Sequence, residues 1–224
     1  MIECAIWWAS PLPNSPEYVA LLDEPERGRH QAYRQEIDQR RFLTGRVMAK
    51  TVLGERLGRP AEEVRFDATC EDCGKPHGKP RLEGVEFSIS HSGDRIGLAV
   101  TTAPVGLDVE TENRRADDSL ISYALNETEQ KALAGLSPEE RASAFFQYWT
   151  RKEALMKATG KGLKIPLQAI TLDGARLADS THAALTPSGT WLADLTPGEG
   201  YRAAVAVLTR ENVETTEATW TPQT

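Results

Sequence analysis

Two acidic residues, Asp108 and Glu110, alternate with apolar residues in the segment VGLDVE at 105–110. In a β-strand, alternate side chains point to the same face, so the two carboxylates are expected to lie side by side. Like charges held this close repel one another unless a cation separates them or solvent surrounds them. Carboxylate oxygens suit Mg²⁺, which commonly takes one or two carboxylates together with substrate phosphates. The pair therefore indicates either a magnesium site or a solvated strand end.

A second group that could do chemistry is the pair Glu153 and Lys157, four positions apart in the helical stretch 149–157. This spacing puts both side chains on one helix face, where alone they would form an ordinary surface ion pair. The same region carries four further cations, Arg151, Lys152, Lys161 and Lys164. Clustered cations beside the turn GKG at 160–162 suit a phosphate-rich ligand.

Ser90 and His91 stand at the end of an expected strand, in FSISHSG at 87–93. A serine and a histidine could belong to a nucleophilic triad, but the chain has no nucleophile elbow of the G-x-S-x-G type. We interpret His91 as a hydrogen-bond donor to phosphate or as the holder of a base, against the simpler alternative of a strand-end turn.

Further basic residues are candidates for phosphate binding. Lys79 precedes Pro80, which favours an extended backbone at the lysine. Arg46 and Lys50 share one face of a helix expected over 40–50. For that helix the simpler interpretation is a solvated basic face.

Cys70, Cys73 and His77 form a C-x₂-C-x₃-H string, which suggests zinc. A structural zinc site takes four ligands, and Cys4 and the other histidines are remote in the sequence. A loop of incidental thiols is therefore favoured, and the two thiols could join in a disulfide under oxidation.

Patterning predicts the elements that must position these residues. The expected strands occupy 2–9, two segments within 85–100, 105–110, 169–172, 191–195 and 201–209. Helical patterns cover 17–58 and 120–160, residues 67–84 form a loop, and the last dozen residues fray. Strand, helices and strands thus occur twice, which predicts an α+β fold of two similar halves, 1–103 and 104–224.

The chain has 224 residues and a net charge of −7, and 40% of its residues are hydrophobic, which excludes a collagen or a wholly disordered chain. No apolar run is long enough to cross a bilayer, and no signal peptide is evident. Three cysteines suit a reducing compartment, so we expect a cytoplasmic protein. The acidic total argues against nucleic acid as a partner. This total is an average over two basic segments, 24–60 and 150–165, and an acidic segment between them, 106–140.

Five ordered blocks give the sequence its resemblance to a known family. They are RRFLTGR at 40–46, GKP at 78–80, FSISHSG at 87–93, VGLDVE at 105–110 and YWTRKEALMKATGKGL at 148–163. The sequence resembles the 4′-phosphopantetheinyl transferases, specifically the larger, surfactin-synthetase-type members. The resemblance implies two halves related by a pseudo-twofold axis, with coenzyme A in the cleft between them, and a monomer.

The resemblance also implies the reaction and its residues. The phosphopantetheine arm of coenzyme A passes to a serine of an acyl, peptidyl or polyketide carrier protein, and 3′,5′-ADP is released. Asp108, Glu110 and Glu153 match the carboxylates that bind Mg²⁺, with Mn²⁺ left open. Glu153 matches the residue that deprotonates the serine, and Lys157 the cation at the α-phosphate. Asp108, Glu153 and Lys157 are therefore the expected catalytic residues.

The resemblance assigns phosphate contacts to seven further positions, Arg41, Arg46, Lys50, Lys79, Ser90, His91 and Lys161. A lysine common in the family is replaced by Asn113, with Arg114 and Arg115 directly after it. Glu129 matches a semi-preserved family acid. Two alternatives stay open: a catalytically silent module that binds coenzyme A, and a zinc-dependent interaction protein built on the cysteine loop.

Overall fold

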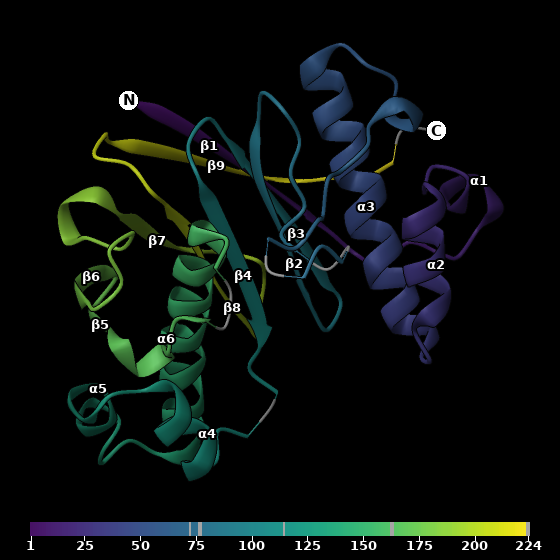
Figure 1. Ribbon diagram of the computed structural model, residues 1–224. Helices are drawn as coiled ribbons and strands as arrows, with labels where there is room; N and C mark the ends of the chain where they lie inside the picture. The colour runs from purple at the N-terminus through teal and green to yellow at the C-terminus, as the bar shows by residue number, and fades with distance from the viewer. Residues whose placement is uncertain (72, 76–77, 114, 162–163, 223–224) are drawn as a thin grey trace.

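The computed structural model describes residues 1–71, 73–75, 78–113, 115–161 and 164–222, which form two β-sheets, a small hairpin and flanking helices (Figure 1). The strands are β1 (Ile2–Ala9), β2 (Glu86–Ser92), β3 (Arg95–Thr101), β4 (Val105–Thr111), β5 (Ile170–Asp173), β6 (Arg176–Ser180), β7 (Trp191–Leu195), β8 (Tyr201–Val207) and β9 (Val213–Thr219). The α-helices are α1 (Pro16–Val19), α2 (Glu24–Ala32), α3 (Glu36–Leu57), α4 (Asp118–Ala124), α5 (Glu127–Ala132) and α6 (Pro138–Thr159). Single 3₁₀ turns are η1 (Ala61–Glu63), η3 (Leu167–Ala169) and η4 (Pro187–Gly189).

The two larger sheets repeat one topology. Their strand orders are β2-β3-β1-β9 and β4-β8-β7. In each half, two later strands form an antiparallel pair, β2 with β3 and β7 with β8. The first strand of the half then pairs antiparallel with the second member of that pair, β1 with β3 and β4 with β8. The predicted α+β fold of two similar halves is thereby confirmed.

The prediction of a frayed C-terminus is wrong, because β9 is a regular strand parallel to β1. The pairing runs from Ile2 opposite Val213 to Trp8 opposite Thr219. The next residue, Trp220, donates its N–H to the Trp8 carbonyl at 2.7 Å and packs partly buried against the clusters under α3. Val and Thr residues favour a strand, and the tryptophan anchors it. β9 therefore joins the sheet of the N-terminal half, although it lies in the range 104–224; the boundary itself stays a prediction.

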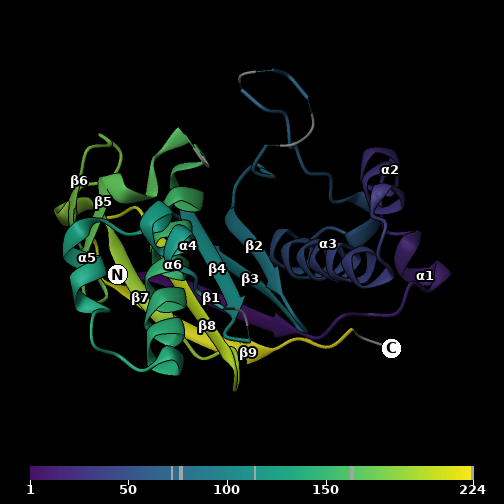
Figure 2. The ribbon, with the colours of Figure 1, turned by 90° about the horizontal axis from the view of Figure 1, so that it is seen from below.

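The helices of the two halves lie on opposite sides of the molecule (Figure 2). α3 covers the first sheet, and α6 packs against β4 and β8. α6 begins with a capping box in which Ser137 and Glu140 satisfy each other's backbone N–H groups. It ends at Gly160, whose φ of 69° fits the left-handed C-terminal cap. Among the described residues, no helix has the length and apolar character needed to cross a bilayer.

The close approach of α6 to β4 depends on Gly106. A Cβ atom there would overlap the carbonyl oxygen of Ala154 and the amide nitrogen of Ala158. Only glycine lets the helix backbone come this near the strand. Because Asp108 follows two residues later on β4, and Glu153 precedes Ala154 on α6, this contact sets the separation of the two acids.

Candidate active site

The two halves meet where β2 lies beside β4, and three serines of β2 make the contact. Every second residue of β2 faces β4, as the alternation of a strand requires. Their Oγ atoms accept hydrogen bonds from backbone N–H groups: Ser88 from Leu107 at 3.0 Å, Ser90 from Val109 at 3.3 Å and Ser92 from Thr111 at 3.2 Å. We call this row of three residues the serine ladder. It joins the edge strands of two sheets through side chains.

Asp108 is buried beside the ladder. Its Oδ1 accepts hydrogen bonds from Lys157 Nζ at 2.6 Å and from Ser90 Oγ at 3.0 Å. Its Oδ2 is buried and has no hydrogen-bond partner among the residues that the structure describes. Burial raises the pKa of Asp108 above its ordinary value, although the charge of Lys157 opposes the shift. A buried carboxylate oxygen without a partner is costly, so this atom marks a place for a further ligand.

Lys157 connects α6 to both strands of the junction. Its ammonium donates to Asp108, to Ser90 Oγ at 3.0 Å and to the Leu107 carbonyl at 3.1 Å, which uses all three of its N–H bonds. The side chain is 32% exposed, so its charge still faces the cleft. Ser90 is equally saturated, because its hydroxyl donates to Asp108 and accepts from Val109 and Lys157.

Glu153 and Glu110 complete the acidic group. Glu153 is half-buried on α6; desolvation, followed by the neighbouring charge of Asp108, raises its pKa to about 7 from 4.5, with a smaller contribution from Glu110. Glu110 accepts a hydrogen bond from Ser92 Oγ at 2.8 Å. A cavity of about 330 Å³ opens over the group and is lined by Ile89, Ser90, His91, Asp108, Glu110, Trp149, Glu153 and Lys157.

The carboxylates of Asp108, Glu110 and Glu153 fit a divalent cation that binds together with a phosphate ligand. Within the described residues, no group of three or more His, Cys, Asp or Glu side chains is arranged so that it could hold a metal ion by itself. Mg²⁺ commonly needs only one or two carboxylates, because water and substrate phosphates supply its other ligands. A cation here would give the Oδ2 of Asp108 a partner, and its charge would offset the desolvation and the neighbouring charge of Asp108 that raise the pKa of Glu153.

His91 lines this cavity from the N-terminal half, and Arg41 of the same half lies near enough for its charge to act on His91. Desolvation, then the charges of Lys157 and Arg41, lower the pKa of His91 to about 4. The imidazole is therefore neutral at pH 7, which suits it to a hydrogen-bonding role. Arg41 donates to the Gly93 carbonyl at 2.7 Å and to Asp38 at 2.8 Å.

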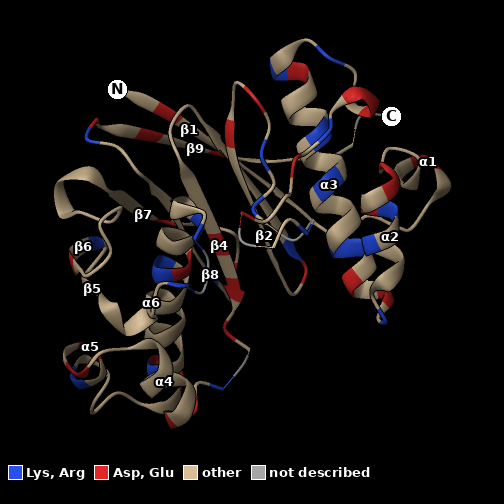
Figure 3. Cartoon of the chain, viewed as in Figure 1, with Lys and Arg blue, Asp and Glu red and all other residues tan. Residues whose placement is uncertain are grey.

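A second cavity of about 720 Å³ shares Lys157 with the first. Its lining carries five cations, Lys79, Arg81, Lys157, Lys161 and Lys164. Lys79 donates to the Val105 carbonyl at 2.8 Å, and burial lowers its pKa. Glu71 pairs with Arg81 at 2.6 Å and with Lys161 at 3.0 Å. Figure 3 shows acidic residues along β4, with basic residues on the neighbouring α6 and on α3 beyond β2.

Arg46 and Lys50 do not lie in either cavity, so the structure corrects their assignment as phosphate contacts. The side chain of Lys50 is fully buried; its Nζ lies 3.0 Å from Glu26 Oε2 and donates to the Val64 carbonyl at 2.7 Å. Arg46 is stacked between Phe42 and Phe66, and its Nε lies 3.6 Å from Glu26 Oε1. Both cations neutralise Glu26, which α2 presents to the inner face of α3.

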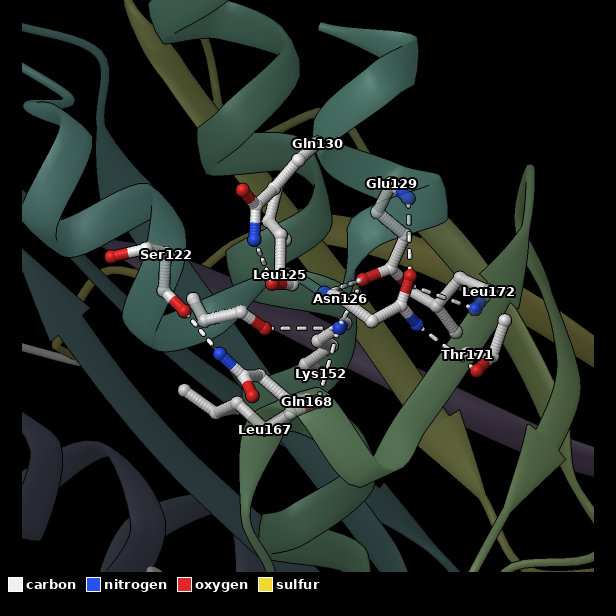
Figure 4. Close-up of polar contacts among 11 residues, drawn as sticks. Ser122, Leu125, Asn126, Glu129, Gln130, Lys152, Leu167, Gln168, Thr171 and Leu172 are labelled. Carbon is white, nitrogen blue, oxygen red and sulfur yellow. Dashed lines mark hydrogen bonds and ion pairs between the residues drawn. The ribbon is translucent and has the colours of Figure 1, made fainter.

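Lys152 and Glu129 form a buried ion pair (Figure 4). Lys152 directly precedes Glu153 on α6, and the sequence alone did not reveal this pair. Lys152 Nζ donates to Glu129 Oε2 at 2.5 Å and to the carbonyls of Ala124 and Leu167, each at 3.0 Å. The other oxygen of Glu129 accepts the N–H of Leu172 at 3.0 Å. The pair ties α6 to α4, α5 and β5, and so holds the helix that carries Glu153.

Several expected residues contribute no described site contact. Asn113 and Arg115 are exposed beyond the end of β4. His77 and Arg114 lie outside the described residues. Cys70 lines the larger cavity, and Cys73 is exposed three residues later in a tight turn.

Comparisons with known proteins identify the family. Residues 104–206 match the model described as 4′-phosphopantetheinyl transferase superfamily, and residues 8–103 match that described as 4′-phosphopantetheinyl transferase, N-terminal. The chain therefore belongs to the 4′-phosphopantetheinyl transferases, and the resemblance drawn from its motifs is confirmed.

Three curated relatives support the family assignment. Putative 4′-phosphopantetheinyl transferase slr0495 of Synechocystis sp. is 32% identical, over 96% of this chain and 91% of that protein. 4′-Phosphopantetheinyl transferase HetI of Nostoc sp. is 34% identical, over 89% and 86%. 4′-Phosphopantetheinyl transferase psf-1 of Bacillus pumilus is 34% identical, over 71% of this chain and 66% of that protein.

Proposed function

We propose that this chain transfers the 4′-phosphopantetheine arm of coenzyme A to a serine hydroxyl of an apo acyl, peptidyl or polyketide carrier protein. The serine oxygen forms a bond to the β-phosphorus of the coenzyme, the bond to the bridging pyrophosphate oxygen breaks, and 3′,5′-ADP leaves. Family membership supports the reaction class. Action as a monomer is part of the proposal.

The observation that carries the proposal is the meeting of three carboxylates and Lys157 at the junction of the halves, next to a basic cavity. Asp108, Glu110 and Glu153 would hold Mg²⁺, or Mn²⁺ in its place. When bound, the metal would supply positive charge for the phosphate oxygens in the transition state. The partnerless Oδ2 of Asp108 supports this assignment.

Glu153 is the proposed general base for the incoming serine. A serine hydroxyl is a weak nucleophile, and a carboxylate with a pKa near the working pH is an effective proton acceptor. In the metal-free protein the pKa of Glu153 is raised to about 7, mainly by desolvation; a bound cation would lower it, so that Glu153 would be present as the carboxylate that accepts a proton. Lys157 is the proposed cation at the α-phosphate, which leaves with 3′,5′-ADP, and there it would exchange its contact to the Leu107 carbonyl for a phosphate oxygen.

The remaining phosphates of coenzyme A are assigned to the larger cavity and its rim. Lys79 and Lys161 would contact them from the cavity, and Arg41 and His91 from the edge nearer the acids. Ser90 contributes by fixing Asp108 and Lys157, since its hydroxyl is saturated by protein groups.

Incubation with apo carrier protein, coenzyme A and Mg²⁺ tests the proposal. The expected result is a mass gain of one phosphopantetheine on the carrier, measured on the intact protein, with release of 3′,5′-ADP. The matched control is the same carrier with its acceptor serine changed to alanine. Binding of coenzyme A without transfer to any of several carrier types, all modified by a known transferase, would indicate a silent module instead.

A further inference from the structure

The serine ladder does more than join the two halves. In a regular sheet, adjacent edge strands pair through backbone groups on both sides. Here the N–H groups of β4 are satisfied by hydroxyls of β2. A hydroxyl that accepts a backbone N–H still has its own proton to donate. The three serines differ in the group to which the hydroxyl donates that proton.

Ser92 gives its proton to an acid of the proposed metal site. Its Oγ donates to Glu110 Oε2 at 2.8 Å while accepting from the Thr111 N–H at 3.2 Å. The hydroxyl is thus fixed by the backbone at one end and fixes a carboxylate at the other. Glu110 stands near the end of β4, where it is half-buried, and its long side chain has three rotatable bonds.

We propose that Ser92 is a positioning residue that orients the Glu110 carboxylate for the divalent cation. This inference rests on the proposed function, because it takes Glu110 as a metal ligand. A ligand held by a hydrogen bond loses little freedom when the metal binds, and removal of such supporting partners commonly weakens metal affinity by about 10- to 100-fold.

Ser88 provides a matched control on the same strand. It accepts the Leu107 N–H at 3.0 Å, as Ser92 accepts that of Thr111, but its described hydrogen bonds include none to a carboxylate. Loss of the Ser88 hydroxyl therefore removes a contact between the halves without releasing an acid. Comparing variants of Ser88 and Ser92 therefore distinguishes the loss of a contact between β2 and β4 from the loss of the hydrogen bond that orients Glu110.

Two variants of Ser92 with one shape test the proposal. Ser92→Thr keeps the hydroxyl, whereas Ser92→Val replaces it with a methyl group; both are β-branched and suit a strand. The binding of Mn²⁺ and Mg²⁺ is measured by titration in the presence of coenzyme A, alongside thermal unfolding and transfer to carrier protein. Ser88→Ala is measured in parallel, with coenzyme A at saturation for each variant because Ser88 also lines the larger cavity.

Ser92→Val should raise the metal dissociation constant about tenfold, while Ser92→Thr and Ser88→Ala stay within about twofold of the parent protein. Addition of more metal should restore much of the transfer rate of Ser92→Val. If Ser92→Val binds metal as Ser92→Thr does, the inference is wrong and the proposed function stands. If the parent protein neither binds metal nor transfers the arm, both proposals are overturned.

Discussion

Glu153→Gln should stabilise the metal-free protein at neutral pH while it removes transfer. The carboxylate is half-buried beside Asp108 and Glu110, and desolvation with these neighbours raises its pKa to about 7 from 4.5. The folded state therefore favours the protonated form. Glutamine has nearly the same shape and does not ionise, so the variant avoids the cost of a charged Glu153.

The size of the effect follows from the pKa change. At 1.36 kcal/mol per unit, a rise from 4.5 to about 7 corresponds to a ceiling of about 3 kcal/mol. Partial exposure of Glu153 lets water screen the charge, which reduces the expected value to about 1–2 kcal/mol. Because the folded pKa is raised, this penalty is absent below about pH 4.5, grows as pH rises to about 7 and is constant above.

Thermal unfolding of both proteins without metal at pH 5 and pH 8 tests this reasoning. At pH 8 the variant should melt about 2–8 °C higher, and at pH 5 the difference should be small. Mg²⁺ with coenzyme A should stabilise the parent protein more than the variant. An equal difference at both pH values, or a less stable variant at pH 8, would refute the account of Glu153.

Three further changes test other parts of the structure. Asp108→Asn should lower kcat for transfer by roughly 100-fold or more because it removes a charged ligand, while circular dichroism shows an unchanged fold. Gly106→Ala should destabilise the protein by about 3 kcal/mol or more in urea unfolding, because its methyl group overlaps the α6 backbone. Glu129→Ala should cost roughly 3–5 kcal/mol in the same assay, since Lys152 would be buried without its counter-ion. Stabilities equal to the parent protein would contradict the last two.

The sequence predicted the acids of the site better than the cations. Strand alternation and helical spacing are local properties, and they suffice to align Asp108 with Glu110 and Glu153 with Lys157. For a basic helix face, by contrast, the local sequence does not show whether the face meets a ligand, solvent or another helix. Arg46 and Lys50 do share a face, but that face meets Glu26 from α2, which only the packing of two helices decides.

The longest-range features were beyond local patterning. β9 pairs with β1 across nearly the whole chain, and its segment VETTEAT has a mostly polar composition that also suits a solvated tail. The buried ion pair of Lys152 and Glu129 could not be predicted either, because its two residues come from helices that only the tertiary fold brings together. In the sequence, Lys152 is one more cation in a basic stretch, and only the positions of α5 and β5 give it a buried partner.

The junction explains how adjoining cavities would serve the two proposed tasks, binding of a divalent cation and binding of the phosphates of coenzyme A. The acids and Lys157 come from the C-terminal half, whereas Lys79 and His91 come from the N-terminal half. The serine ladder attaches β2 directly to β4, and apolar residues of both sheets, among them Trp8 and Leu107, share one buried cluster, so hydroxyls and apolar packing together hold the two groups side by side. Both halves line the basic cavity, with Lys79 and Arg81 from one half and Lys157 and Lys161 from the other, so the junction sets that cavity directly beside the acids.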